Sequence, residues 1–271
     1  MKNFKKIIYP LVFSSFCAAS LLSQAAAVDD LITAVIRNSD VAVREQINKA
    51  GNINARNAKG QTALTLAIHQ QSEKAIPILL QSPKIDISAT NAAGESPLML
   101  AIFTEQYDLA RTLIKRGAAI NKTGWTPLHY AATKGNLDMI RLLLDKDAYI
   151  DSASPNETTP LMMAAQFGNE SAVLLLLQKG ADPWARNQLH LTAIDFARKG
   201  GNAASIRYIQ TAQSRRKPVY NAQPLKPLSP ASAAELKGLP IPENPEEPEI
   251  YYPEGMQPPA KPAASTQQTS Q

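Results

Sequence analysis

Cysteine and histidine, on which many metal sites and catalytic centres depend, are nearly absent from this sequence. Its 271 residues include one cysteine and three histidines. No spacing among His69, His129 and His190 resembles that of metal ligands. The sequence also has neither a nucleophile elbow nor a phosphate-binding loop. We therefore expect a protein that is not an enzyme, with no catalytic residue, no metal and no cofactor.

Long apolar stretches are also scarce, and the one that occurs lies at the N-terminus. Three lysines precede the apolar residues 7–22, and the small residues 25–27 fit a cleavage site. This pattern predicts a secretory signal peptide over residues 1–27, cleaved after Ala27. The signal peptide contains Cys17, so the mature chain would hold no disulfide in a compartment that permits them.

An uncleaved membrane anchor is the competing interpretation, although the apolar stretch is short for a span of about 20 residues. Lipidation is disfavoured, because Phe16 stands where a lipoprotein signal has a small residue before Cys17. No further stretch of membrane length follows in the sequence. We expect a periplasmic or secreted bacterial protein with no integral membrane span after cleavage.

An excess of charge of one sign is missing from the rest of the chain. The formal net charge is +5, of which three signal-peptide lysines supply +3, while six basic residues and six glutamates balance after Gln213. Only +2 is left for the repeat region. Binding to nucleic acid or to an anionic membrane needs a concentrated basic face, so we predict neither as a partner.

What the sequence does contain is a six-residue phrase that recurs five times. The copies begin at residues 62, 96, 126, 159 and 192, in steps of 34, 30, 33 and 33 residues. Such a period indicates one supersecondary unit stacked repeatedly rather than a globule with one active cleft. The copies are Thr62-Ala63-Leu64-Thr65-Leu66-Ala67, Ser96-Pro97-Leu98-Met99-Leu100-Ala101, Thr126-Pro127-Leu128-His129-Tyr130-Ala131, Thr159-Pro160-Leu161-Met162-Met163-Ala164 and Thr192-Ala193-Ile194-Asp195-Phe196-Ala197.

Each unit is predicted to be two helices joined by a tight turn and followed by an extended loop, which we call a finger. Proline in the second place of the phrase suits the first turn of a helix. Nine residues after the phrase begins, Gly135 and its equivalents suit a helix end, and the next residue, such as Asn136, suits a helix N-cap. The second apolar run, such as residues 139–144, is too short to be stable alone, so the units must pack together.

The phrase resembles the T-P-L-H-x-A signature of the ankyrin-repeat family, and the copy at residues 126–131 matches it fully. The chain is similar to secreted or periplasmic bacterial ankyrin-repeat proteins. The resemblance implies an all-α solenoid of about six helix-turn-helix units with short fingers, which binds a protein through its concave surface. It also implies a structural role for His129, whose hydrogen bonds would tie the loop to the helix start. The other copies carry Thr65, Met99, Met162 and Asp195 there, which argues against a shared catalytic role.

The predicted domains are a signal peptide (1–27), an ankyrin-repeat domain (28–213) and a proline-rich disordered tail (214–271). The predicted units of the repeat domain are 28–57 as the N-terminal cap, 58–91, 92–121, 122–154, 155–187 and 188–213 as the C-terminal cap. Three departures from the pattern predict local irregularity. Pro77 should kink or shorten its helix, the finger around residues 120–123 should be clipped, and Glu157 and His190 replace a glycine two residues before the phrase.

Candidate partner-binding residues follow from counting along each unit. They occupy the position just before the phrase, the positions seven and eight residues after its start, and the finger tips. Aromatic residues and arginine are favoured anchors in interfaces. The competing interpretation is that Phe103 and Phe167 pack between units and that Trp184 covers its own finger. The candidates are Trp125, Phe103, Phe167, Lys134, Trp184, Arg186 and Arg56.

The tail carries 12 of the 20 prolines and five glutamates between residues 243 and 254. This composition cannot bury enough surface to fold and favours extended chain. Tyr251 and Tyr252 within it form a candidate docking motif, and a solvated spacer is the competing interpretation.

Three functions stay open at this point. The first is a monomeric, non-enzymatic periplasmic adaptor for an unidentified protein partner. The second is a secreted ankyrin effector that acts on host proteins. The third is an accessory protein that supports an envelope enzyme.

Overall fold

The computed structural model describes residues 26–215, and every regular element in this range is a helix. The predicted tail docking residues Tyr251 and Tyr252 lie outside the described residues, as does most of the predicted signal peptide. The predictions for those segments therefore stay predictions.

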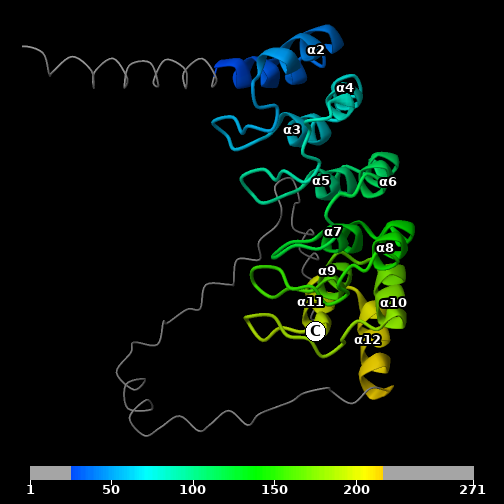
Figure 1. The fold of residues 1–271 in the computed structure, drawn as a ribbon. Coiled ribbons are helices and arrows are strands. Elements are labelled where there is room, and N and C mark those ends of the chain that lie inside the picture. The colour runs from blue at the N-terminus through cyan, green and yellow to red at the C-terminus, as the bar shows by residue number, and fades with distance from the viewer. Residues whose placement is uncertain (1–25, 216–271) are drawn as a thin grey trace, which may run out of the picture.

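The described helices form pairs that are stacked along one axis (Figure 1). A helix over residues 26–36 and α2 (Asp40–Lys49) make the first pair. The five later pairs each begin with a helix that starts in the recurring phrase. They are α3 (Ala63–His69) with α4 (Ala75–Gln81), α5 (Pro97–Phe103) with α6 (Tyr107–Lys115), α7 (Pro127–Lys134) with α8 (Leu137–Leu144), α9 (Pro160–Gln166) with α10 (Glu170–Lys179), and α11 (Ala193–Lys199) with α12 (Ala203–Arg215).

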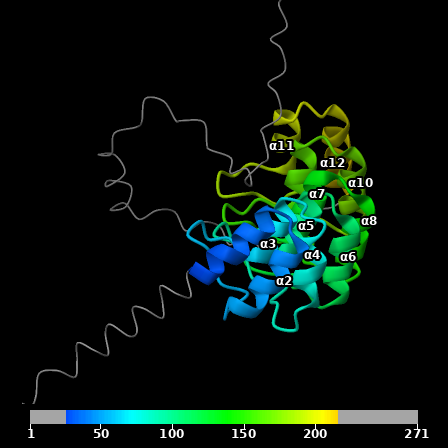
Figure 2. The same ribbon diagram turned by 90° about the horizontal axis from the view of Figure 1, so that it is seen from above.

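The first helices of the pairs lie in the middle of the stack, with the fingers on one side and the second helices on the other (Figure 1). Each first helix contacts the next, from α3 through α5, α7 and α9 to α11. Figure 2 shows the same layers from above. The core is one continuous row of buried apolar side chains between these layers, and residues such as Leu98, Leu128 and Leu161 are fully buried in it. The predicted all-α solenoid is confirmed.

The tight turn of each unit has a left-handed residue at the predicted position. This conformation reverses the chain after the first helix, and glycine adopts it without steric cost. Two of the five units that carry the phrase have a residue with a side chain there instead, at a cost in strain. The residues and their φ angles are Gln71 (54°), Glu105 (61°), Gly135 (67°), Gly168 (77°) and Gly201 (69°).

The residue after this turn has two different roles. Asn136 and Asn202 cap the second helix as predicted, and each accepts the N–H of the residue three positions on, at 2.8 and 3.1 Å. Asn169 does not cap its helix, so the prediction is wrong there. Its amide donates instead to the carbonyls of Ala132 and Thr133 in the preceding unit. The Asn169 side chain thus joins two neighbouring units. The sequence of a single unit does not predict such a contact, because the partner carbonyls belong to another unit.

The predicted irregularities appear as local changes in length and backbone strain. Pro77 is the third residue of α4, where its missing N–H costs no helical hydrogen bond, and α4 is only seven residues long. The finger between α6 and α7 covers only residues 116–126, whereas the next one covers 145–159. Glu157 and His190 adopt left-handed φ angles of 62° and 59°. Their turns therefore keep the shape that glycine gives the other units, at a cost in strain.

Candidate functional site

The candidate site is the side of the stack that carries the fingers, which we call the finger face. It comprises the fingers together with the C-terminal ends of the first helices, where each tight turn begins. Phe103, at the end of α5, and Lys134, at the end of α7, lie on it and are half-buried. Both occupy positions that were counted as accessible from the sequence, and both belong to neighbouring units.

Phe103 and Lys134 meet at the centre of the finger face. The Lys134 ammonium lies 4.9 Å from the centroid of the Phe103 ring and 3.0 Å from Glu105 Oε1. The same ring forms a T-shaped pair with the Tyr130 ring, with ring centroids 6.1 Å apart and planes at 90°. A cation placed over an aromatic face is held by the ring quadrupole. The result is a fixed aromatic and cationic centre, to which we refer as the Phe103–Lys134 centre.

A buried carboxylate supports this centre from below. Glu95 is 3% exposed, and its Oε1 accepts the Tyr130 hydroxyl at 2.7 Å. Its Oε2 accepts the Asn91 amide, also at 2.7 Å. These hydrogen bonds satisfy a group that would otherwise be costly to bury. Tyr130 is thereby held in place beneath Phe103.

The position just before the phrase is buried in three of its five copies, so the prediction that Trp125 lies on the surface is wrong. Trp125, Glu95 and Thr158 are 8%, 3% and 1% exposed. These residues close the base of the finger, where the chain turns into the first helix and neighbouring units cover it. The Trp125 ring packs edge-on against His129, with ring centroids 5.1 Å apart. Trp125 is therefore part of the core rather than of an aromatic strip on the surface.

His129 has the structural role that the resemblance implied. Its Nδ1 lies 3.2 Å from the Thr126 backbone nitrogen and accepts that N–H, so Nε2 carries the proton and donates to the Thr158 carbonyl at 2.9 Å. The ring is fully buried. Burial lowers the pKa of His129 to about 4, since a charge there would lose its hydration. The neutral imidazole joins the helix start of one unit to the finger of the next.

Trp184 and Arg186 lie apart from the Phe103–Lys134 centre, on the last finger. They line an open cavity of about 370 Å³ together with three acidic side chains, among them Glu157. Arg186 is exposed and donates to the His190 carbonyl at 2.9 Å within its own finger. The structure therefore brings these two candidates together, but not with Phe103.

The two remaining candidates lie in the first and the fifth of the six stacked units. Arg56 is exposed on the first finger and bridges to the next one, where its Nε donates to the Thr90 carbonyl at 2.8 Å. Phe167 directly follows α9, is half-buried and packs against the core. The competing interpretation of inward packing thus holds in part for both Phe103 and Phe167.

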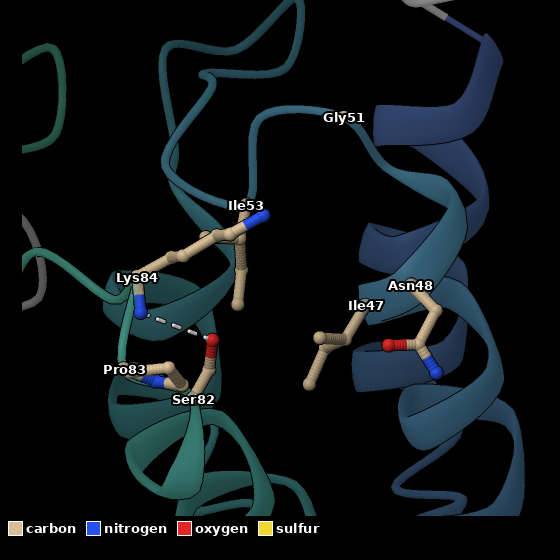
Figure 3. A pocket seen from close by; sticks show the side chains of 7 residues that line it. All are labelled: Ile47, Asn48, Gly51, Ile53, Ser82, Pro83 and Lys84. Atoms are coloured by element: carbon tan, nitrogen blue, oxygen red, sulfur yellow. Dashed lines mark hydrogen bonds between the residues drawn. The ribbon is translucent and has the colours of Figure 1, made fainter.

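A second hollow, of about 230 Å³, lies between the first two units, and no pattern in the sequence predicts it. Figure 3 shows Ile47, at the end of α2, and Ile53, on the first finger, pointing into this space. Pro83 and Lys84 close its other side, and the backbone N–H of Lys84 donates to the Ser82 hydroxyl. These residues lie outside the recurring phrase, and their spacing in the sequence does not show that they meet.

Within residues 26–215, no three histidine, cysteine, aspartate or glutamate side chains gather as metal ligands would. No helix in the same range has the length and apolar character needed to cross a membrane.

Comparison with known proteins agrees with this geometry. The family model described as ankyrin repeats in three copies matches residues 31–123 and 119–187. Tyrosine-protein kinase HTK16 of Hydra vulgaris is 32% identical over 102 residues, which is 36% of this chain and 13% of that protein. Tyrosine-protein kinase Shark of Drosophila melanogaster is 32% identical over 127 residues, 45% of this chain and 13% of that protein. The chain thus spans only a small part of these relatives.

Solved structures match over more of their length. A chain in the complex of a predatory endopeptidase from Bdellovibrio bacteriovorus with an immunity protein is 27% identical, with a TM-score of 0.57, covering 67% of this chain and 97% of that one. The ankyrin repeat domain of Bcl-3 is 28% identical, with a TM-score of 0.54, covering 66% of this chain and 81% of that one.

An ankyrin repeat domain from Acinetobacter baumannii is 23% identical with a TM-score of 0.56, covers 67% of this chain and 96% of that one, and shows the shared fold. The family model extends over residues 31–187 of 271, more than half of the chain. Its repeats, the stacked helix pairs and the capped recurring phrase together show that this protein belongs to the ankyrin-repeat family, whose repeats form scaffolds for protein–protein interaction.

Proposed function

We propose that this protein is a monomeric, non-enzymatic adaptor of the bacterial periplasm that binds one protein partner through its finger face. The observation that carries the proposal is the Phe103–Lys134 centre. It presents a half-buried aromatic ring and a cation that are both held in place by neighbouring groups. Rigid aromatic anchors in such positions supply much of the affinity of protein interfaces, because little side-chain freedom is lost on binding.

The periplasmic location rests on the predicted signal peptide over residues 1–27. Fractionation of cells and spent medium tests it. Mature protein in the periplasmic fraction is the expected result. Mature protein that accumulates in the medium would instead favour the secreted effector that acts on host proteins.

One comparison favours an envelope enzyme as the partner. The similar chain from Bdellovibrio bacteriovorus comes from a complex of an endopeptidase with an immunity protein. We therefore propose an enzyme of the cell envelope, of the hydrolase class, as the first partner to seek. This is the accessory role that the sequence left open.

Crosslinked co-purification of the full chain from its own cells tests partner binding. We expect one prominent partner, whose recovery falls at least tenfold in a Phe103→Ala/Lys134→Ala variant. The matched control is Tyr208→Ala/Lys179→Ala, which removes an aromatic and a lysine from the second helices α12 and α10 on the other side of the stack. Equal loss in both variants, or no loss in the first, would show that the finger face is not the binding surface.

A further inference from the structure

The hollow between the first two units combines apolar walls with positive charge. Ile47, Ile53 and Pro83 form its apolar walls, and Lys84 is exposed at its edge. The side chain of Lys84 extends alongside Ile53 in Figure 3. No acidic side chain lines the hollow. It is therefore suited to an apolar or aromatic group that has a carboxylate close to it.

Further cations lie on the finger that borders the hollow. Arg56 and Lys59 are exposed there, and neither forms an ion pair within residues 26–215. Asp86 is the nearby exposed acid on the next finger, and its carboxylate accepts the N–H of Ser88 at 2.8 Å. The hollow and its border thus form a basic surface around an apolar centre.

Hydrogen bonds between the two fingers fix the shape of this surface. The Asn54 amide donates to the Lys84 carbonyl at 2.8 Å, and its Oδ1 accepts the Asp86 N–H at 2.8 Å. Arg56 joins the same fingers through its bond to Thr90. A preformed site of this kind loses little conformational freedom when it is filled.

We propose that this hollow binds the acidic, tyrosine-bearing part of the chain's own tail, residues 243–254. That segment has five glutamates, Tyr251 and Tyr252, and no basic residue lies between Lys237 and Lys261. A tyrosine ring enters between Ile47 and Ile53, and the neighbouring glutamates face Lys84 and the cations of the first finger. Charge complementarity and a matching apolar group select this segment as the occupant.

The length of the tail permits this contact. Residues 216–250 follow α12 directly, and as proline-rich chain they reach about 3.1 Å per residue, or roughly 100 Å. Six stacked helices at about 10 Å spacing extend over roughly 50 Å. Because the tail is tethered, its effective concentration is in the millimolar range, so a weak contact is sufficient. If the finger face binds the proposed partner, the docked tail competes with that partner for the first finger, because the tail covers Arg56.

A synthetic fluorescent peptide of residues 243–254 tests the proposal by anisotropy, with the full mature chain at low salt. In a tail variant, all five glutamates of the segment become Gln and both tyrosines become Ala, so the hollow is vacated. We expect the peptide to bind this variant at least tenfold more tightly than the wild-type chain, whose own tail competes. Equal affinity for the two chains would overturn the proposal.

Site variants in the tail-variant background locate the contact. Lys84→Gln should weaken peptide binding at least threefold, whereas Lys146→Gln, an exposed lysine in the turn after α8, should not change it. Equal loss in both would indicate unspecific charge attraction and refute the site, and circular dichroism checks that each variant is folded. Concentration-dependent dimers of the wild type that vanish in the tail variant would show exchange between copies and overturn docking within one chain. No partner protein enters this experiment, so its result is separate from that of the co-purification.

Discussion

The ammonium group of Lys134 lies 4.9 Å from the centroid of the Phe103 ring, although the two residues belong to different repeats. Glu105, which follows Phe103 closely in the chain, holds the same ammonium at 3.0 Å. Two repeats are therefore joined at the surface as well as through the core. The contact also fixes the side chains that we propose as partner anchors.

A double-mutant cycle with Phe103→Leu and Lys134→Met should show that the two residues are coupled. We expect a coupling of about 0.5–1 kcal/mol in the free energy of unfolding, the size of a partly exposed cation–π contact. Urea denaturation of the four proteins measures it. Strictly additive single effects would mean that the ring and the ammonium are close but do not interact.

Stability should fall in mild acid because of His129. The pKa of its imidazole is lowered by burial from the ordinary 6.5 to about 4. The folded-state value lies below the unfolded one, so the contribution of the neutral ring is fully present above pH 6.5 and is lost as the pH falls toward 4. The loss amounts to about 3 kcal/mol.

The pH effect is measured by urea denaturation between pH 7.5 and 4.5 beside a His129→Asn variant. Asparagine can accept the Thr126 N–H but does not titrate. The variant should be less stable at pH 7.5 and should show the smaller decrease toward pH 4.5. Parallel curves for both proteins would assign the acid effect to other groups.

Glycine should stabilise the two strained turns at Glu157 and His190. The equivalent glycines in three other units have φ angles of 72°, 76° and 79°, in the same left-handed region. Glu157→Gly and His190→Gly should each raise the free energy of unfolding by about 0.5–1 kcal/mol, since relief of strain exceeds the added chain entropy. Thermal denaturation compares them with Glu157→Gln, which keeps a Cβ and should bring no gain. A loss of stability on glycine substitution would show that the side chains contribute more than the strain costs.

Two neighbouring glycines should respond differently to alanine. A Cβ on Gly200 would collide with the backbone carbonyl of Gln166, whereas a Cβ on Gly201 meets no atom within 4 Å. Gly200→Ala should cost about 1–3 kcal/mol by overpacking. Gly201→Ala, at a φ of 69°, should cost about 1 kcal/mol by backbone strain alone. Thermal denaturation ranks the two, and the reverse order would contradict the close approach of α11 to α9.

The unit architecture could be predicted because its signals are local. The capping position of Thr62, the first-turn prolines and the left-handed residue at Gly135 each depend on the backbone a few residues away. The period of the phrase extends these local predictions along the stack.

The candidate site was predicted less well. Phe103 and Lys134 do lie on the finger face, but Trp125 is buried, because neighbouring units cover the finger base.

The sequence alone determined that helix pairs repeat and where each first helix begins, and its resemblance to the ankyrin-repeat family implied the structural role of His129. Only the tertiary structure decided which side chains face outward and which residues of different units meet. Glu95 beneath Tyr130, Lys134 over Phe103, and Ile47 with Pro83 around one hollow all join residues from neighbouring units. Such pairs depend on how one unit is rotated and shifted against the next. That geometry is set by side-chain packing across the whole interface between units, and no single repeat contains it.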